Sequence, residues 1–153
     1  MDLAFNKQAS FSYDLLEKFE AGIVLLGHEV KSVKQGQISL KSAYITIKRT
    51  PKPELYLINS TISKYQKAGS LADYNPLRER KLLVGKSELS RLIGKLEQKG
   101  LTLLPVRVYT KHNLVKLEIA LGRGKKLFEK KEAKKQKDIE RDTQRFLKTN
   151  KFQ

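Results

Sequence analysis

The stretch 20–34, which reads EAGIVLLGHEVKSVK, holds the residues whose types and spacing are best suited to chemistry. Its two carboxylates, Glu20 and Glu29, occur in a chain with a large excess of cations. They could cap a helix, balance a basic neighbour, or accept hydrogen bonds from base and sugar groups of RNA. Glycine within a strand often marks a bulge or a close backbone approach, and Gly22 lies in such a strand. A solvated strand face that ends in a capped turn is the alternative interpretation.

Side chains that support catalysis are scarce. The chain has no Cys, which excludes disulfides, thiolate zinc sites and cysteine nucleophiles. Its two histidines, His28 and His112, are far apart in sequence, and no pair of carboxylates comes with a His or Cys partner. We therefore expect a protein that is not an enzyme and that uses no catalytic residues, no metal and no cofactor.

The charge of the chain favours a polyanionic partner. Its 153 residues fit one domain, or one domain with a tail, and carry a net charge of +16. Nucleic acid is the commonest polyanion that such a surface binds. A membrane surface is the other candidate, but the amphipathic apolar stripe that it requires is missing. No segment resembles a secretory signal or a span, and we expect a cytoplasmic protein that is monomeric when free.

The elements that must position the stretch 20–34 follow from local patterns. A strand is expected over 11–26, and a short helix over 27–36 with Val30 and Val33 on its core face. Alternation over 42–48, the prolines of the turn 50–53 and a return over 55–64 predict a hairpin. An irregular loop over 65–79 and a short strand over 80–84 follow.

The second half of the chain contains the clearest periodicity. Apolar residues recur at helical spacing over 87–99, with Ser87 as the expected N-cap and Gly100 as a left-handed stop. Two strands are predicted over 101–110 and 114–121. Pro105 lacks an N–H group, so its strand should be an edge or carry a bulge there.

The composition changes from residue 122 onward. Residues 123–153 hold twelve Lys and Arg against five Asp and Glu, a net charge of +7, and their apolar residues are sparse. We expect a domain over 1–121 and a basic tail over 122–153. The tail should be disordered when free and become helical against a phosphate-rich partner, because helix formers dominate it.

Several segments resemble the SsrA-binding protein family, also called small protein B. The match rests on Asn6-Lys7-Gln8-Ala9, on Glu-Ala-Gly-Ile at 20–23 with Gly27 and Glu-Val-Lys-Ser at 29–32, on Arg-Lys-Leu-Leu at 80–83, and on Gly-Lys-Lys at 124–126. The pattern departs from the family at Glu129 and Lys131, where the family has Asp and Arg, and Lys lacks the bidentate fork of Arg.

The resemblance implies a mainly β fold, an OB-like six-stranded antiparallel β-barrel with about three helices, of which the third lies in the basic tail. It also implies a factor that binds the tRNA-like part of transfer-messenger RNA and delivers it to stalled ribosomes for trans-translation, with the small-subunit decoding centre and its ribosomal RNA as the second partner.

The resemblance further implies two sets of site residues, to which phosphate neutralisation, hydrogen bonding and stacking are the physical roles that we assign. The expected RNA-binding residues are Asn6, Lys7, Glu20, Gly22, Lys31, Arg80, Lys81, Leu83 and Lys116. The expected ribosome-facing residues are Gly124, Lys125, Lys126, Phe128, Glu129, Lys130 and Lys131.

Two of the expected roles, and the function as a whole, have alternative interpretations. Asn6 could form a turn or cap, and Phe128 could pack against the barrel instead of stacking on RNA. For the whole chain, a basic structural ribosomal protein with an OB-like barrel is the first alternative. An RNA-modifying or RNA-cleaving enzyme is the second.

Overall fold

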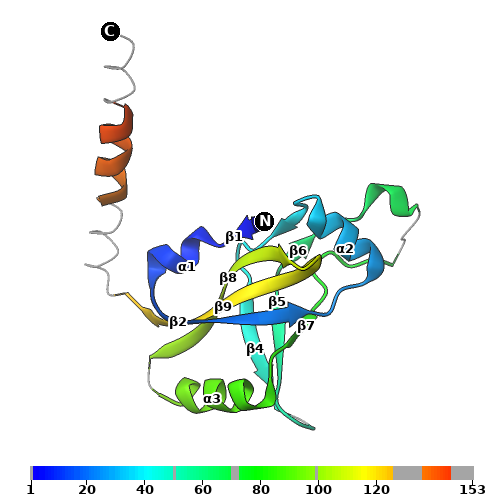
Figure 1. Cartoon of the computed structure of the whole chain (residues 1–153), viewed down its shortest axis with the longest axis horizontal. Helices are drawn as coiled ribbons and strands as arrows, with labels where there is room; N and C mark the ends of the chain where they lie inside the picture. The colour runs from blue at the N-terminus through cyan, green and yellow to red at the C-terminus, as the bar shows by residue number, and fades with distance from the viewer. Residues whose placement is uncertain (1, 50, 70–72, 99, 126–135, 146–153) are drawn as a thin grey trace.

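Antiparallel strands make up most of the fold (Figure 1). The computed structural model describes residues 2–49, 51–69, 73–98, 100–125 and 136–145. The elements in chain order are β1 (Asp2–Phe5), α1 (Lys7–Ser12), β2 (Tyr13–Ile23), α2 (Gly27–Lys34), β3 (Ile38–Ser39), β4 (Tyr44–Lys48), β5 (Glu54–Ile58), β6 (Thr61–Ile62), the 3₁₀ turn η1 (Gln66–Ala68), β7 (Arg80–Leu83), α3 (Lys86–Leu96), β8 (Leu101–Lys111) and β9 (Leu114–Gly124).

The main sheet is open, which corrects the expected six-stranded barrel. Seven strands pair in the order β1-β8-β9-β2-β7-β5-β4, and β3 and β6 form a separate pair. Among the described residues β1 and β4 remain the two edges, since no ladder joins them. The sheet coils, so that β4 and β5 pass behind β2 and β9 in the view of Figure 1. The mainly β, antiparallel class is confirmed.

The β8–β9 hairpin is the longest ladder and follows the sequence prediction closely. His112 and Asn113 form its tip at positive φ, 51° and 65°, as a tight two-residue hairpin turn requires. The ladder shifts register between Pro105 and Arg107. Pro105 therefore sits at a bulge, one of the two predicted outcomes, while β8 itself is covered on both sides by β1 and β9.

Apolar side chains from both layers of the coiled sheet form the core. Leu57 of β5, Leu117 and Ile119 of β9 and Val108 of β8 are fully buried. α3 packs Leu92 against this cluster. The predicted N-cap of α3 was wrong: the helix begins at Lys86 with Gly85 as its N-cap. Gly100 does have the predicted positive φ.

The first 26 residues differ most from the sequence prediction. β1 had not been expected, and residues 11 and 12 belong to α1 instead of a strand. The strand β2 starts at Tyr13 and ends at Ile23, three residues before the predicted end. α2 matches its prediction, with Val33 buried and Gly36 at positive φ just after the helix.

β9 continues to Gly124, so the expected domain boundary after residue 121 falls inside a strand. Gly122 lies where a side chain would clash: an added Cβ would be 2.7 Å from Leu104 Cδ1 and 3.2 Å from Tyr13 Cβ. The backbone N–H of Lys125 donates to Ser12 O, which ties the end of β9 to the end of α1. Residues 136–145 are helical and exposed.

Candidate nucleic-acid interface

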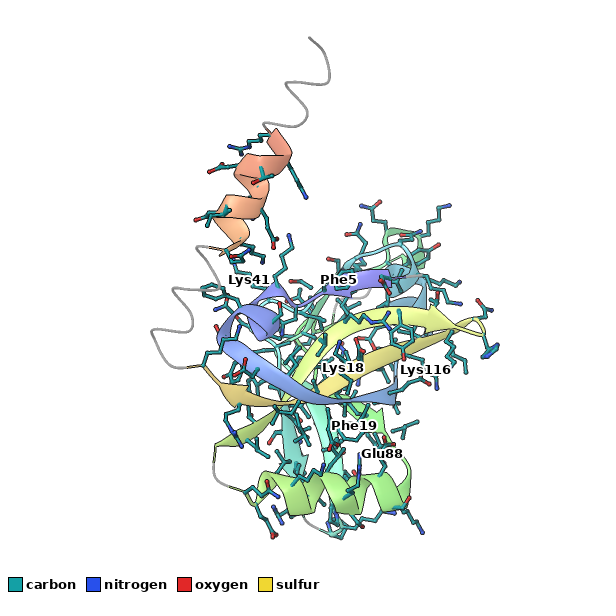
Figure 2. All side chains as sticks on the ribbon, turned by 60° about the vertical axis from the view of Figure 1, so that its left-hand side comes forward. Phe5, Lys18, Phe19, Lys41, Glu88 and Lys116 are labelled. Carbon is teal, nitrogen blue, oxygen red and sulfur yellow. The ribbon has the colours of Figure 1, made fainter. Side chains whose placement is uncertain are left out.

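Three of the expected RNA-binding residues meet on the outer face of the sheet. Cross-strand pairing places Gly22 of β2 opposite both Leu83 of β7 and Lys116 of β9. They line a hollow of about 240 Å³, with the exposed Leu83 at its side. Gly22 has no side chain, so the hollow stays open between Leu83 and Lys116. Figure 2 labels Lys116 on β9 and Lys18 on the adjacent β2.

Glu20 continues this face one pleat along β2. Its carboxylate accepts a hydrogen bond from the hydroxyl of Tyr109 at 2.5 Å, and Lys111 Nζ lies 3.4 Å away. The Tyr109 hydroxyl, followed by Lys111, keeps the pKa of Glu20 below its usual range. Burial and the bond to Glu20 raise the pKa of Tyr109 to about 12. Glu20 is therefore an ionised hydrogen-bond acceptor. It is held in place by Tyr109 of β8, which is separated from β2 by β9.

Lys81 lies on β7, the strand that pairs with the other side of β2. Its Nζ is 3.3 Å from Glu54 Oε1, and Tyr56 donates to the other oxygen of that carboxylate at 2.9 Å. Lys48 lies over the Tyr56 ring at 4.4 Å from its centre. Lys81 and Lys48 are thus both paired with carboxylates, Lys81 with Glu54 and Lys48 with Glu79.

Arg80 is not on the surface, and its expected RNA contact is wrong. Its side chain is fully buried and forms an ion pair with the equally buried Glu29, with Nη2 to Oε2 at 2.5 Å. Arg80 Nη1 also donates to Ser60 O at 2.8 Å. A guanidinium with no exposed area cannot contact a partner, so Arg80 holds the α2–β7 corner together.

Glu29 is the centre of this buried cluster. It accepts from the Leu26 N–H at 2.9 Å and from Arg78 Nη2 at 2.5 Å, in addition to Arg80. Burial alone would raise the pKa of Glu29, but the hydrogen bonds from Leu26, Arg78 and Arg80 outweigh it and lower the pKa to about 2. Tyr74, whose hydroxyl lies 3.0 Å from Glu29, ties the 73–79 loop to the cluster. Of the two carboxylates in the stretch 20–34, Glu20 is therefore exposed and Glu29 is structural.

Lys31 projects from α2, as expected. Its Nζ lies 5.6 Å from the centre of the Tyr65 ring. One turn further, Lys34 donates to Asn113 Oδ1 at 2.9 Å and links α2 to the β8–β9 hairpin tip. In the described part of the chain, Lys18, Lys31 and Lys116 form no ion pair with a carboxylate.

Asn6 and Lys7 lie apart from this face, at the start of α1. Asn6 occupies the N-cap position, but its side chain does not cap the helix. Its Nδ2 instead donates to Pro105 O at 2.8 Å, which fastens the β1–α1 corner to the bulge of β8. The donor side of the amide is therefore structural, while Oδ1 has no protein partner among the described residues. Lys7 is exposed.

Of the expected ribosome-facing residues, the structure describes two. Gly124 ends β9, and Lys125 Nζ donates to Ser10 O at 3.2 Å. Lys126, Phe128, Glu129, Lys130 and Lys131 lie outside the described residues.

Sequence reasoning missed Tyr109, Lys111 and Arg107 of β8 as parts of the outer face. Arg107 is paired with Glu118 and Asp2, and it stacks on Tyr109 at 4.2 Å. The alternation of β8 placed these side chains on one face, but only the β2–β9–β8 order brings them next to Glu20. No group of three or more metal-ligating side chains occurs within the described ranges. Nor does any described helix have the length and apolar character to cross a membrane.

Fold and surface together define a basic, antiparallel β protein with a cationic sheet face and a charged C-terminal extension. The family model described as "SmpB protein" matches residues 3–149. The chain belongs to this family, which is the SsrA-binding protein family of its relatives.

Two relatives illustrate the degree of similarity. The SsrA-binding protein of Trichodesmium erythraeum (strain IMS101) is 47% identical over 143 residues, which cover 94% of this chain and 90% of the relative. That of Magnetococcus marinus (strain ATCC BAA-1437 / JCM 17883 / MC-1) is 45% identical over 148 residues, with 97% and 96% covered. A solved structure described as "tmRNA-SmpB: a journey to the center of the bacterial ribosome" matches with a TM-score of 0.63 and 45% identity, over 80% of this chain and 84% of that one.

Proposed function

We propose that this chain binds the tRNA-like part of transfer-messenger RNA and delivers it to stalled ribosomes in the cytoplasm for trans-translation. The observation that carries the proposal is family membership over residues 3–149, with relatives named SsrA-binding proteins that align with nearly their whole length. The factor acts by binding and positioning, without a catalytic step of its own.

The outer sheet face supplies the contacts to the RNA. Glu20, kept ionised by Tyr109, accepts hydrogen bonds from base or ribose donors. Lys116 neutralises phosphate beside the apolar surface of Leu83. The exposed Lys31, and Lys81 with its partner Glu54, add further contacts to the RNA. This face does not depend on closure of the sheet into a barrel.

The basic tail, residues 122–153, is the part that we assign to the ribosome. Its first residues, Gly124 and Lys125, leave the sheet beside the end of α1. The following cations and Phe128 provide phosphate neutralisation and a stacking ring for ribosomal RNA.

The direct test is capture of the protein from its native lysate followed by sequencing of the bound RNA. Transfer-messenger RNA should be the dominant species, and the protein should be substoichiometric and enriched on stalled ribosomes. Stoichiometric presence in vacant ribosomes would instead support the structural ribosomal protein. Affinity for the tRNA-like fragment should fall with salt, with a slope of log K against log salt of about −0.7 to −0.9 per phosphate contact.

The tail is tested by a chain that stops after Lys125, which keeps all of β9 and its link to Ser12. This truncated protein should fold and bind the tRNA-like fragment, and it should fail to support tagging of nascent chains on stalled ribosomes. Normal tagging by the truncated protein would refute the role of the tail.

A further inference from the structure

A groove beside the first residues of α1, at the end of that helix away from Ser12 and Lys125, is separate from the outer sheet face described above. It has a volume of about 600 Å³ and lies between the β1–α1 corner and the segment 38–42. Figure 2 shows Phe5 and Lys41, one from each of these two segments, along the same edge of the molecule. The groove is therefore built by parts of the chain that are more than thirty residues apart in sequence.

The floor of the groove is apolar and its rim carries an exposed aromatic ring. Ile38 and Leu40 are buried, and Leu3 packs against the same core cluster. Phe5 is 59% exposed. A large apolar side chain is usually buried, so its exposure beside the groove is notable. An exposed ring above an apolar floor is a surface on which a planar base can stack.

The charges around the groove select an anion. Lys7 and Lys41 are exposed, one on each side, and neither forms an ion pair with a carboxylate of the described chain. Among the described residues, no Asp or Glu lines the groove. Two unneutralised cations that line the same groove repel each other less when a phosphate is bound there.

The Asn6 side chain adds an acceptor that suits the edge of a base. The Asn6 amide is fixed by its bond to Pro105 O, which leaves Oδ1 as an oriented acceptor. An acidic peptide would use the two cations but would leave the ring and the amide acceptor unused.

We propose that this groove binds one unpaired nucleotide of the RNA, with its base against Phe5 and its phosphate between Lys7 and Lys41. The inference rests on the proposed function and adds a second contact site to the outer sheet face. It also assigns RNA contacts to Phe5 and Lys41, two residues that lie outside the motifs of the family.

The test compares groove variants with matched surface variants in binding to the tRNA-like fragment of transfer-messenger RNA. Phe5→Ala should weaken binding about fivefold or more, the range for loss of one stacked base, whereas Leu77→Ala, which truncates an equally exposed apolar side chain, should not. Lys41→Gln should weaken binding more than Lys52→Gln, since both remove one exposed charge but Lys52 lies in the β4–β5 turn. Melting temperatures should be unchanged in all four.

A benzophenone amino acid at position 5 provides an independent readout, because it crosslinks to whatever lies against the ring. Crosslinks to an unpaired nucleotide are expected. Crosslinks only to base-paired RNA or to a ribosomal protein would overturn the inference, as would groove variants that bind like their controls. If the unmodified protein does not bind the fragment, the proposed function fails together with this inference. If it binds and only the groove results are negative, this inference alone fails.

Discussion

Arg80 and Glu29 form an ion pair in which neither side chain has any exposed area, with Nη2 and Oε2 2.5 Å apart. The two residues are 51 positions apart and join α2 to β7. Because both charges are removed from water, each depends on the other for compensation. The pair therefore makes the corner between α2 and the sheet intolerant of change at either residue.

Glu29→Gln should destabilise the protein by about 3–5 kcal/mol, since it leaves the buried guanidinium of Arg80 without its counter-charge. Urea denaturation at neutral pH measures this loss. Glu17→Gln is the matched control: Glu17 pairs with Arg91 and Lys95 on the surface, where water and salt screen such pairs and they contribute little to stability. Equal losses in the two variants would show that the buried pair has no special role.

The same pair should produce an acid-sensitive component of stability. The pKa of Glu29 is lowered to about 2 in the folded protein from 4.5. A carboxyl with a lowered folded pKa contributes stability that is complete above the unfolded value and is lost as pH falls through the folded value. The difference in unfolding free energy between the wild type and Glu29→Gln should therefore shrink by roughly 3 kcal/mol between pH 5 and pH 2. A constant difference across this range would contradict the assigned pKa.

Tyr109→Phe should release Glu20 without creating a cavity, because only the hydroxyl that donates to the carboxylate is removed. The pKa of Glu20 should rise toward its usual value, which NMR titration of the carboxyl measures. Affinity for the tRNA-like fragment should fall about fivefold, the effect of roughly 1 kcal/mol per hydrogen bond. Tyr56→Phe removes an equivalent bond to Glu54 and serves as the control. If both variants bind RNA equally well, the Tyr109–Glu20 bond does not orient an RNA contact.

Gly122→Ala should destabilise the sheet by about 1–3 kcal/mol, because its Cβ would lie 2.7 Å from Leu104 Cδ1. Thermal unfolding detects this. Gly94→Ala in α3 is the matched control, since nothing lies within 4 Å of its added Cβ, and it should stabilise by up to about 1 kcal/mol. The double change Gly122→Ala with Leu104→Ala should cost less than the sum of its parts if the clash is the cause.

Local patterns predicted the elements whose signal is repeated within a few residues. The helical spacing of Leu89, Leu92 and Leu96 gave α3, and the alternation over 114–121 gave most of β9. The tight tip at His112 and Asn113 also needs only local backbone geometry. In each case the side-chain period itself specifies which face is buried.

The elements that the sequence did not predict depend on partners far away along the chain. α1 has six residues, and its start is fixed by Asn6 bonding to Pro105, 99 positions later. Arg80 was placed on the RNA-binding face by the family resemblance, whereas its burial depends on Glu29 and Ser60, which are distant in sequence. The closed barrel was implied by the family resemblance, but closure would require the edge strands β1 and β4 to pair, and no local pattern encodes such pairing.

α1 connects two regions that were described separately. Lys7 at its first position borders the groove, while the carbonyl groups of Ser10 and Ser12 at its other end hold Lys125. A helix of six residues is about 9 Å long. The proposed nucleotide site and the root of the tail are therefore about one helix length apart, so that one short element positions both.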